Sequence, residues 1–382
     1  MKLTDICDVQ GGSQPPKEEW SFEEQEGYIR MLQIRDFTQS ERVTPEYIKI
    51  SNSTKICEAD DILIARYGAS IGKILTGLAG AYNVAIMRTI PDTSKIKKKY
   101  LYYYLKSPYF QNAILNVGSR AAQAGFNKED LSKLDIECPE LSEQENIASI
   151  LDKVEIVIRK RKEELVFLDK LIKARFVEMF GDMYLNSKGW PEAKLESMAD
   201  VVSGITKGRK TKAEDLTEVP YMAVSNVKDG YIDWTTMKTI EATQQEIEKY
   251  RLLADDVLMT EGGDPDKVGR GAIIKEPLEN CIHQNHIFRV RLDESMMRPE
   301  FFAEYLQHQR SKRYFLRCAK QTTGIASINM TQLRALPVLM PPLSRQEEFV
   351  LFKAQVNKSK VIDTNIIPRG GFYNGHEFCI SK

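Results

Sequence analysis

The chain has 382 residues, of which 42% are hydrophobic and 28% are charged, and its 54 basic residues balance 54 acidic ones. The length favours two or three domains over a single core, and the composition excludes a disordered or fibrous protein. The sequence contains no apolar run near the roughly 20 residues that span a bilayer, and no signal-peptide-like start. The six cysteines are scattered, which favours reduced thiols in the cytoplasm over disulfides or a zinc ribbon.

In chain order, the first predicted elements are short apolar runs at residues 28–34, 62–65 and 84–87, which are typical of strands. A helix is predicted to follow over residues 100–115. The same order returns later in the chain, with predicted strands at 221–224, 257–259 and 286–290 and then a predicted helix at 299–316. Each half of the chain is therefore expected to be an α+β domain with a small sheet.

Between these halves the sequence predicts one long helix. Ser142 and Glu145 have the spacing of a capping box, and Gly181 is a candidate C-cap. Apolar residues recur at the a and d heptad positions over a charged surface, which predicts a coiled-coil helix about 50 Å long. The alternative of a core helix inside a globule is disfavoured by the length and the charged outer face.

A second helix is expected from Ser344 to about Lys360, with Glu347 completing its capping box, and we expect it to pack antiparallel against the first. Beyond it the sequence to Lys382 follows no helical pattern. A helix this short covers only part of the long one, so we expect homodimerisation or dependence on a partner subunit. The side chains assigned to helix packing are Ile147, Leu151, Val154, Ile158, Leu165, Leu168, Ile172, Phe349, Phe352 and Val356.

The two halves are an internal duplication. Gly12 returns as Gly204, and residues 127–145 align without a gap to residues 329–347. Eight positions of that alignment are identical, and they include Asn127 and Asn329, which we interpret as helix caps. Between these anchors the two copies differ almost completely. A shared frame with unlike interiors indicates one architecture that recognises two different targets.

Zero net charge does not exclude nucleic acid, because a basic footprint can be local, and residues 95–106, 201–212 and 303–321 are locally basic. We expect DNA contacts from Arg, Lys, Gln and Ser on exposed loops, although ordinary surface turns explain any single residue equally well. The candidates are Arg66, Tyr67, Ser70, Lys73, Ser119, Arg120 and Gln123 in the first half, and Lys207, Arg209, Lys210, Lys212, Lys267, Arg270, Lys320, Gln321 and Thr322 in the second.

Both repeats end in the pattern Asn-x3-Leu-x2-Leu-x4-Pro-x-Leu-Ser-x-Gln-Glu. This pattern, with the order domain, long helix, domain, helix, resembles the specificity subunit of Type I restriction–modification systems over about residues 1–360. Segments 27–37, 66–73 and 261–267 are similar to recurrent blocks of that family. The second helix is shorter than the family's usual one, which puts docking of a second modification subunit in doubt.

The resemblance implies an α+β fold: two tandem target-recognition domains with small twisted sheets, separated by long coiled-coil helices. Each domain would read one half of a bipartite, asymmetric DNA site. The implied partners are double-stranded DNA, methyltransferase (modification) subunits and restriction (endonuclease) subunits. The expected boundaries are domain 1 at 1–141, spacer helix at 142–181, domain 2 at 182–343, and a distal helix with a divergent tail at 344–382.

Motifs for catalysis are lacking from the sequence, which has no phosphate-binding Gly-rich loop for ATP. We expect no cofactor, no metal and no catalysis by the isolated chain. The tyrosines at 100 and 102–104 are interpreted as packing residues rather than a base-stacking platform. His283 and His286 should point to opposite faces of a strand, which disfavours a metal site. The alternative function is a coiled-coil scaffold with two protein-binding domains, which explains the basic, Gly-rich loops less well.

Overall fold

The computed structural model describes residues 1–39, 42–118, 125–209, 215–264, 268–322 and 325–362. The chain divides into two compact units, one within residues 1–162 and one within residues 163–368. Among the described residues, no helix has both the length and the apolarity that crossing a membrane requires.

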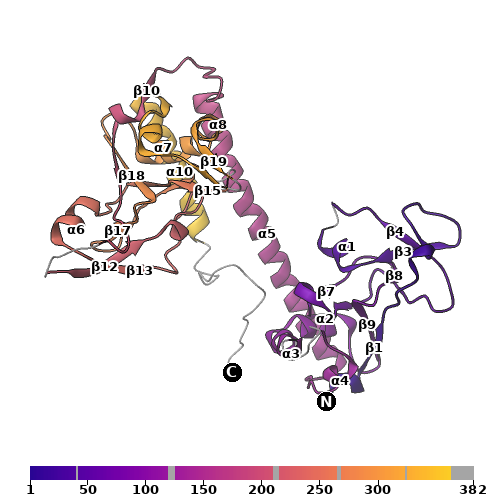
Figure 1. Ribbon diagram of the computed structural model, residues 1–382. Helices are drawn as coiled ribbons and strands as arrows, with labels where there is room; N and C mark the ends of the chain where they lie inside the picture. The colour runs from indigo at the N-terminus through magenta and orange to yellow at the C-terminus, as the bar shows by residue number, and fades with distance from the viewer. Residues whose placement is uncertain (40–41, 119–124, 210–214, 265–267, 323–324, 363–382) are drawn as a thin grey trace. The chain divides into compact units, whose positions relative to one another are not determined.

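The first unit is built from two small sheets and short helices (Figure 1). One sheet has the order β1-β9-β6-β7, with β1 Cys7–Gly11, β9 Ile86–Pro91, β6 Leu63–Ala65 and β7 Ile74–Leu75. The other has the order β2-β4-β3-β8-β5, with β2 Trp20–Ser21, β4 Glu46–Lys49, β3 Tyr28–Leu32, β8 Gly80–Tyr82 and β5 Ile56–Cys57. The helices are α1 Ile34–Thr38, α2 Lys98–Lys106, α3 Pro108–Gly118 and α4 Lys128–Leu131.

The second unit repeats this arrangement with its own sheets. The order β11-β18-β14-β16 comprises β11 Ala199–Ser203, β18 Ile287–Leu292, β14 Val257–Thr260 and β16 Gly271–Ile273. The order β13-β12-β17 comprises β13 Lys238–Ala242, β12 Thr217–Met222 and β17 Ile282–His283. Two smaller sheets pair β10 Glu192–Lys194 with β21 Pro337–Leu339, and β15 Gly262–Gly263 with β20 Ile325–Ser327 and β19 Lys320–Thr322. The helices are α6 Gln244–Tyr250, α7 Pro299–Leu306, α8 Gln309–Cys318 and α9 Met330–Arg334.

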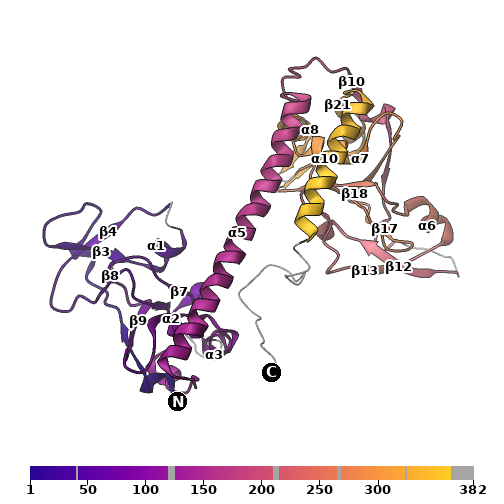
Figure 2. The same ribbon diagram turned by 180° about the vertical axis from the view of Figure 1, so that it is seen from behind.

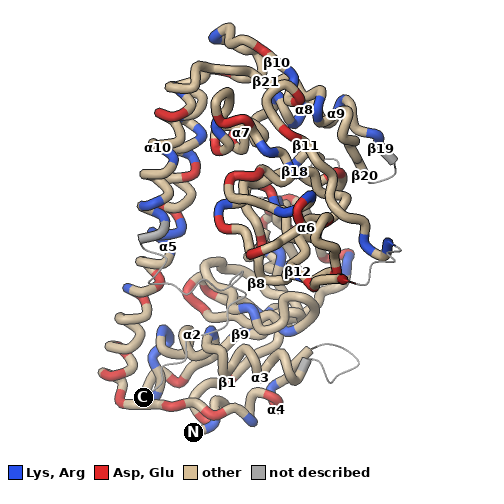
Figure 3. Tube along the Cα trace, turned by 90° about the vertical axis from the view of Figure 1, so that its left-hand side faces the viewer, with Lys and Arg blue, Asp and Glu red and all other residues tan. Residues whose placement is uncertain are grey.

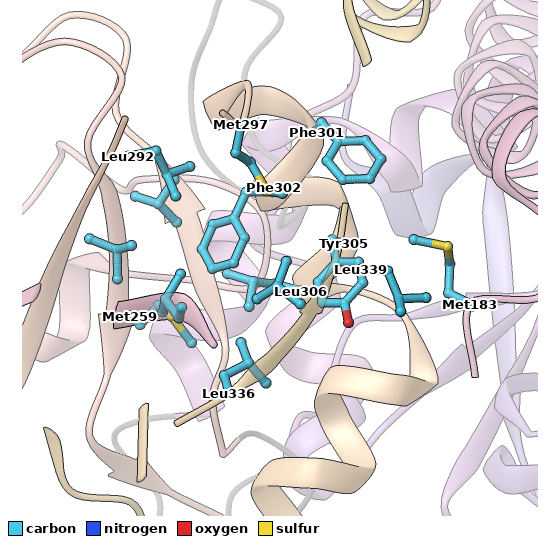
Figure 4. Close-up of a cluster of buried hydrophobic side chains, with 14 of the residues drawn as sticks. Met183, Met259, Leu292, Met297, Phe301, Phe302, Tyr305, Leu306, Leu336 and Leu339 are labelled. Carbon is cyan, nitrogen blue, oxygen red and sulfur yellow. The ribbon is translucent and has the colours of Figure 1, made fainter. Parts of the chain in front are cut away.

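The main core of the second unit lies between helix α7 and the β11-β18-β14-β16 sheet (Figure 4). Phe302 and Leu306 of α7 meet Met259 of β14 and Leu292 of β18 in this core, and all four side chains are buried. Burial of such side chains contributes roughly 1.5–3 kcal/mol each. The predicted α+β domains with small sheets are thus confirmed.

The helix predicted over residues 100–115 is in fact two helices, α2 and α3, and the helix predicted over residues 299–316 is also two, α7 and α8. Ser107 separates the first pair with extended backbone, φ −65° and ψ 151°, because the residue before a proline avoids the helical region. His308 separates the second pair and stacks on Phe176, with ring centroids 4.2 Å apart. Periodicity alone misses both breaks, since the apolar spacing continues across them.

The long helix α5 runs unbroken from Leu141 to Phe180. Gly181 follows it with φ +78°, and its N–H donates to Val177 O at 2.7 Å, so the predicted C-cap is confirmed. The predicted capping boxes are wrong, because α5 and α10 (Leu343–Ile362) each begin one residue before the serine. Both serines therefore lie inside the first helical turn.

A buried glutamine in that first turn ties each helix to the end of another. Gln144 accepts a hydrogen bond from Lys97 N at 2.8 Å and donates to Pro139 O at 2.8 Å. Gln346 repeats both bonds, with Arg298 N at 2.8 Å and Pro341 O at 2.9 Å. Both glutamines have no solvent exposure, and a buried polar group must be hydrogen-bonded. This geometry explains why the repeat retains glutamine.

Within the second unit, α10 packs antiparallel against the last turns of α5, as predicted (Figure 2). Lys360 pairs with Asp169 at 2.6 Å, and Glu348 pairs with Arg175 at 2.9 Å. The later residue of α10, Lys360, pairs with the earlier residue of α5, Asp169, so the two helices run in opposite directions. The predicted packing residues Ile172, Phe349 and Val356 are buried, while Leu168 and Phe352 are partly buried against the same core.

Candidate nucleic-acid interface

The first candidate surface is the turn of residues 66–73, which links β6 to β7. The turn is closed by two backbone hydrogen bonds of 2.9 Å, from Gly72 N to Ala65 O and from Ala65 N to Lys73 O. Gly68 and Gly72 both have positive φ, +71° and +79°, which only glycine adopts at little cost. Tyr67 and Lys73 are exposed and Ser70 is half-buried. The turn thus presents small and polar residues to solvent, as the sequence predicted.

Arg66 differs from the rest of this turn because its guanidinium is already engaged. Its Nε donates to Phe126 O at 3.3 Å, and the guanidinium carbon lies 5.0 Å from the centre of the Tyr67 ring. Tyr67 in turn forms an isolated bridge with Gly125. Arg66 therefore orders the base of the turn, whatever else it contacts.

In the second unit, Lys207 is exposed in the segment that follows Gly204. Its neighbour Arg209 is held internally: its Nε and Nη2 donate to the Glu246 carboxylate at 2.6 and 2.5 Å. This ion pair raises the pKa of Arg209 and lowers the pKa of Glu246 to about 2. Arg209 is thus committed to bracing α6, and Lys207 is the better candidate for a contact outside the protein.

The sheet β15-β20-β19 forms the other part of this surface. Gly262 and Gly263 of β15 pair with Ser327 and Ala326 of β20. A Cβ on Gly262 would lie 3.1 Å from Ala326 O, so the strands approach closely there. Lys320 of β19 is exposed and Arg270 is half-buried.

Gln321 and Thr322 lie in β19. The candidates outside the described residues are Ser119, Arg120, Gln123, Lys210, Lys212 and Lys267.

The two units match residue by residue around these surfaces, because the same backbone hydrogen bonds recur. Arg66 N donates to Ala85 O at 2.8 Å, and Glu261 N donates to His286 O at 3.0 Å. One residue later in each unit, the hydrogen bond from Ile86 N to Asn83 O repeats as the bond from Ile287 N to Gln284 O, each 2.9 Å. Arg66 therefore corresponds to Glu261, and Ala85 to His286. The two units share this backbone arrangement, whereas the charge at the matched position is positive in the first unit (Arg66) and negative in the second (Glu261).

The sequence did not single out Asn285 or His286 as DNA contacts, whereas Glu261 lies in the segment 261–267 that carries part of the family resemblance. His286 Nδ1 lies 2.5 Å from the Glu261 carboxylate, and His286 Nε2 lies 3.4 Å from Asn285 Nδ2. The sequence had raised His286 only as a metal ligand. Extending the repeat alignment through residues 83–86 would have shown Asn285 and His286 opposite Val84 and Ala85.

The two histidines of this region lie in different surroundings. His283 is buried, and burial lowers its pKa to about 3, while its ring nitrogens face Tyr250 O and Val202 O at 3.2 and 3.3 Å. His286 is exposed, but it lies in the turn between β17 and β18, so the prediction that both histidines lie on one strand is wrong. Over the described part of the chain, no three His, Cys, Asp or Glu side chains gather as metal ligands would.

The tyrosines of α2 serve packing, as predicted. Tyr103 donates to Asp152 of α5 at 2.7 Å, which secures α2 to the first turns of the long helix. Tyr100 and Tyr104 donate to the carbonyl oxygens of Glu137 and Asp135, each at 2.9 Å. Tyr100, Tyr102 and Tyr104 also pack against the buried core of this unit, which favours packing over base stacking.

The long helix retains apolar side chains in solvent. In the first unit Ile147, Leu151 and Ile158 are half-buried while Val154 is 38% exposed, and in the second unit Leu165 is half-buried. Figure 3 shows basic and acidic residues interspersed along α5 and α10, as the zero net charge suggests. The most exposed large apolar side chains of α5 are Ile150, Val157, Val166, Phe167, Leu171 and Val177.

Comparison with known proteins adds the family. The profile described as the Type I restriction modification DNA specificity domain matches residues 1–166 and 187–363. The putative type I restriction enzyme MjaX specificity subunit of Methanocaldococcus jannaschii is 28% identical over 160 residues, which are 42% of this chain and 37% of that protein. The EcoKI specificity subunit of Escherichia coli K12 is 22% identical over 264 residues, 66% of this chain and 56% of that one. The chain thus spans between a third and three fifths of these relatives.

Two solved structures share the fold. A chain from a study of complex assembly and conformational transition of the type I R-M system has a TM-score of 0.53 at 15% identity, covering 96% of this chain and 91% of that one. The S subunit of a Type I restriction–modification system from M. genitalium has a TM-score of 0.52 at 16% identity, covering 96% and 92%. At this identity the likeness is evidence of fold alone.

Proposed function

Because the chain belongs to the Type I restriction modification DNA specificity domain family, we propose that it is the DNA-reading subunit of such a system. Each unit reads one half of a bipartite, asymmetric target, and the chain directs methyltransferase and endonuclease subunits to it. The observation that carries this proposal is the pair of matched frames with unlike exposed loops. A shared frame positions each loop alike, while the different side chains suit two different half-sites.

We assign no catalytic step to this chain, so that methylation and cleavage belong to its partners. The exposed apolar residues of α5 support a role for that helix in docking a modification subunit or a second copy of the chain, because exposed apolar stripes are disfavoured. The five described cysteines are unpaired thiols, which suits the cytoplasm, where such systems would meet DNA. The family match favours DNA reading over the coiled-coil scaffold.

Exchange of one unit tests the two-reader arrangement. Replacing residues 1–140 by the first domain of another family member should change one half of the sequence that the assembled complex methylates. The other half should stay as it was, because the second unit carries its own loops. Methylation mapping of the host genome measures both halves at once. A change in both halves, or in neither, contradicts the proposal.

The exposed Lys207 is expected to contact phosphate rather than a base, because an ammonium acts as a point charge without bidentate geometry. Lys207→Ala should weaken binding to all duplexes alike and reduce the slope of log affinity against log salt by about 1. Titration of the complex with DNA at several salt concentrations measures this slope. Lys194→Ala, in strand β10 and outside the proposed interface, serves as the control. A changed base preference with an unaltered slope would refute the assignment.

A further inference from the structure

Three side chains of the second unit form a connected polar chain on the proposed DNA surface. The Glu261 carboxylate meets His286 Nδ1 at 2.5 Å, and His286 Nε2 meets the Asn285 amide nitrogen at 3.4 Å. The His286 side chain is 56% exposed and that of Glu261 is 33% exposed. This group of three side chains therefore lies at the protein surface, where it can contact a partner molecule.

The backbone around this group is fixed by its neighbours. Asn285 N donates to Ile205 O at 3.0 Å, and Ser203 Oγ donates to Asn285 O at 2.6 Å. These bonds hold Asn285 beside the segment that carries Lys207. Glu261 N donates to His286 O at 3.0 Å, which holds the carboxylate beside the imidazole.

The hydrogen-bond directions define the role of each member. In the tautomer that directs the Nδ1 proton of His286 to the Glu261 carboxylate, the ring nitrogen Nε2 is an acceptor. Nε2 then accepts one proton of the Asn285 amide. The second amide proton and the carbonyl oxygen of Asn285 remain side by side, and this is the arrangement that pairs with N7 and N6 of adenine.

We propose that Asn285 reads an adenine in the half-site of the second unit, with His286 and Glu261 as positioning residues that orient its amide. This inference rests on the proposed function. A carboxylate facing phosphate would be repelled, so Glu261 fits a base-facing position better than a backbone-facing one. Lys207, two residues beyond Ile205, supplies a positive charge for the adjacent phosphates.

The first unit provides a matched control. There the corresponding residues are Val84, Ala85 and Arg66, so the same backbone frame carries no such polar chain. Val84 is 40% exposed, and its truncation leaves no buried cavity. Val84→Ala therefore alters the equivalent position without altering a base-reading amide.

The test maps methylation by the complete complex that contains the full chain. Asn285→Ala should reduce discrimination by roughly ten- to a hundredfold at one A·T pair, in the half-site that exchange of residues 1–140 leaves unchanged. Glu261→Ala should relax the same pair more weakly, and Glu261→Gln should restore it, since an amide oxygen still accepts the Nδ1 proton. Val84→Ala should leave the methylated sequence unaltered. Thermal unfolding of each variant should match the parent chain, because the group lies at the surface.

Other outcomes separate the failures. If the parent complex methylates no defined sequence, the proposed function itself fails. If the parent sequence is well defined but Asn285→Ala leaves it unchanged, this inference alone is overturned. Relaxation at a G·C pair after Glu261→Ala, with Asn285→Ala silent, would make Glu261 a direct reader of cytosine and would also overturn it.

Discussion

Replacing Gly12 or Gly204 by alanine is expected to destabilise its unit by at least about 3 kcal/mol, the upper range for overpacking. A Cβ on Gly12 would lie 2.1 Å from Asn83 O, and a Cβ on Gly204 would lie 1.9 Å from His283 O. Both neighbours are backbone carbonyl oxygens, so they cannot rotate away as a side chain would. Denaturant unfolding of the full chain, followed by circular dichroism, measures the loss.

Gly11→Ala is the matched control for this prediction. Its Cβ would meet only Arg66 Nη1, at 3.2 Å, and that atom ends a flexible side chain. We expect less than about 1 kcal/mol from this change, since a long side chain can shift. Equal effects at Gly11 and Gly12 would mean that the close backbone approach is not what selects glycine.

Phe349→Ala is expected to destabilise the second unit by about 3–5 kcal/mol, the usual cost of removing a large buried aromatic side chain. Phe349 has no solvent exposure, and its ring centroid lies 5.2 Å from that of Phe176 and 5.8 Å from that of Phe180. Its loss would leave a cavity where α10 meets the last turns of α5. Thermal or denaturant unfolding reports the change as a lower midpoint for this unit.

Leu351→Ala provides the comparison on the same helix. Leu351 is 67% exposed, so its truncation should change stability by less than about 0.5 kcal/mol. If Phe349→Ala were as mild as Leu351→Ala, α10 would not be anchored through its aromatic face. The antiparallel packing would then rest on its ion pairs, which are worth little at an exposed surface.

The two predictions concern different features of the structure, close backbone approach in one case and aromatic packing in the other. Gly12 and Gly204 allow a close backbone approach in each unit, and the segment that follows Gly204 carries the candidate DNA contact Lys207. Phe349 fixes the distal helix to the long helix. A variant at Gly204 should therefore impair DNA reading along with stability, whereas one at Phe349 should act through stability first.

Some features were determined by the sequence alone, because they depend on local spacing. The extent of the long helix up to Gly181 and the start of the second helix follow from residues near one another in the chain, and the duplication follows from comparing the two halves of the sequence. Asn127 and Asn329 cap α4 and α9, with hydrogen bonds of 3.0 and 2.9 Å to Asp130 N and Gln332 N, as their position in the repeat predicted. The first backbone N–H groups of a helix lack partners within the helix in any fold, so the side chains that cap them can be recognised in the sequence.

Other features were decided only by the tertiary structure, because they join residues far apart in the chain. Gln144 and Gln346 recur at the same position of the repeat, but the sequence does not show that each side chain accepts a hydrogen bond from the start of a distant helix. The sequence predicts Arg209 as a DNA contact, but in the structure its guanidinium pairs with Glu246, 37 residues away. Glu261 and His286 meet across 25 residues, and neither carries a local signal. Ion pairs between exposed side chains far apart in the chain produce no periodic pattern in the sequence. The tertiary structure is therefore needed to show which polar side chains are engaged within the protein.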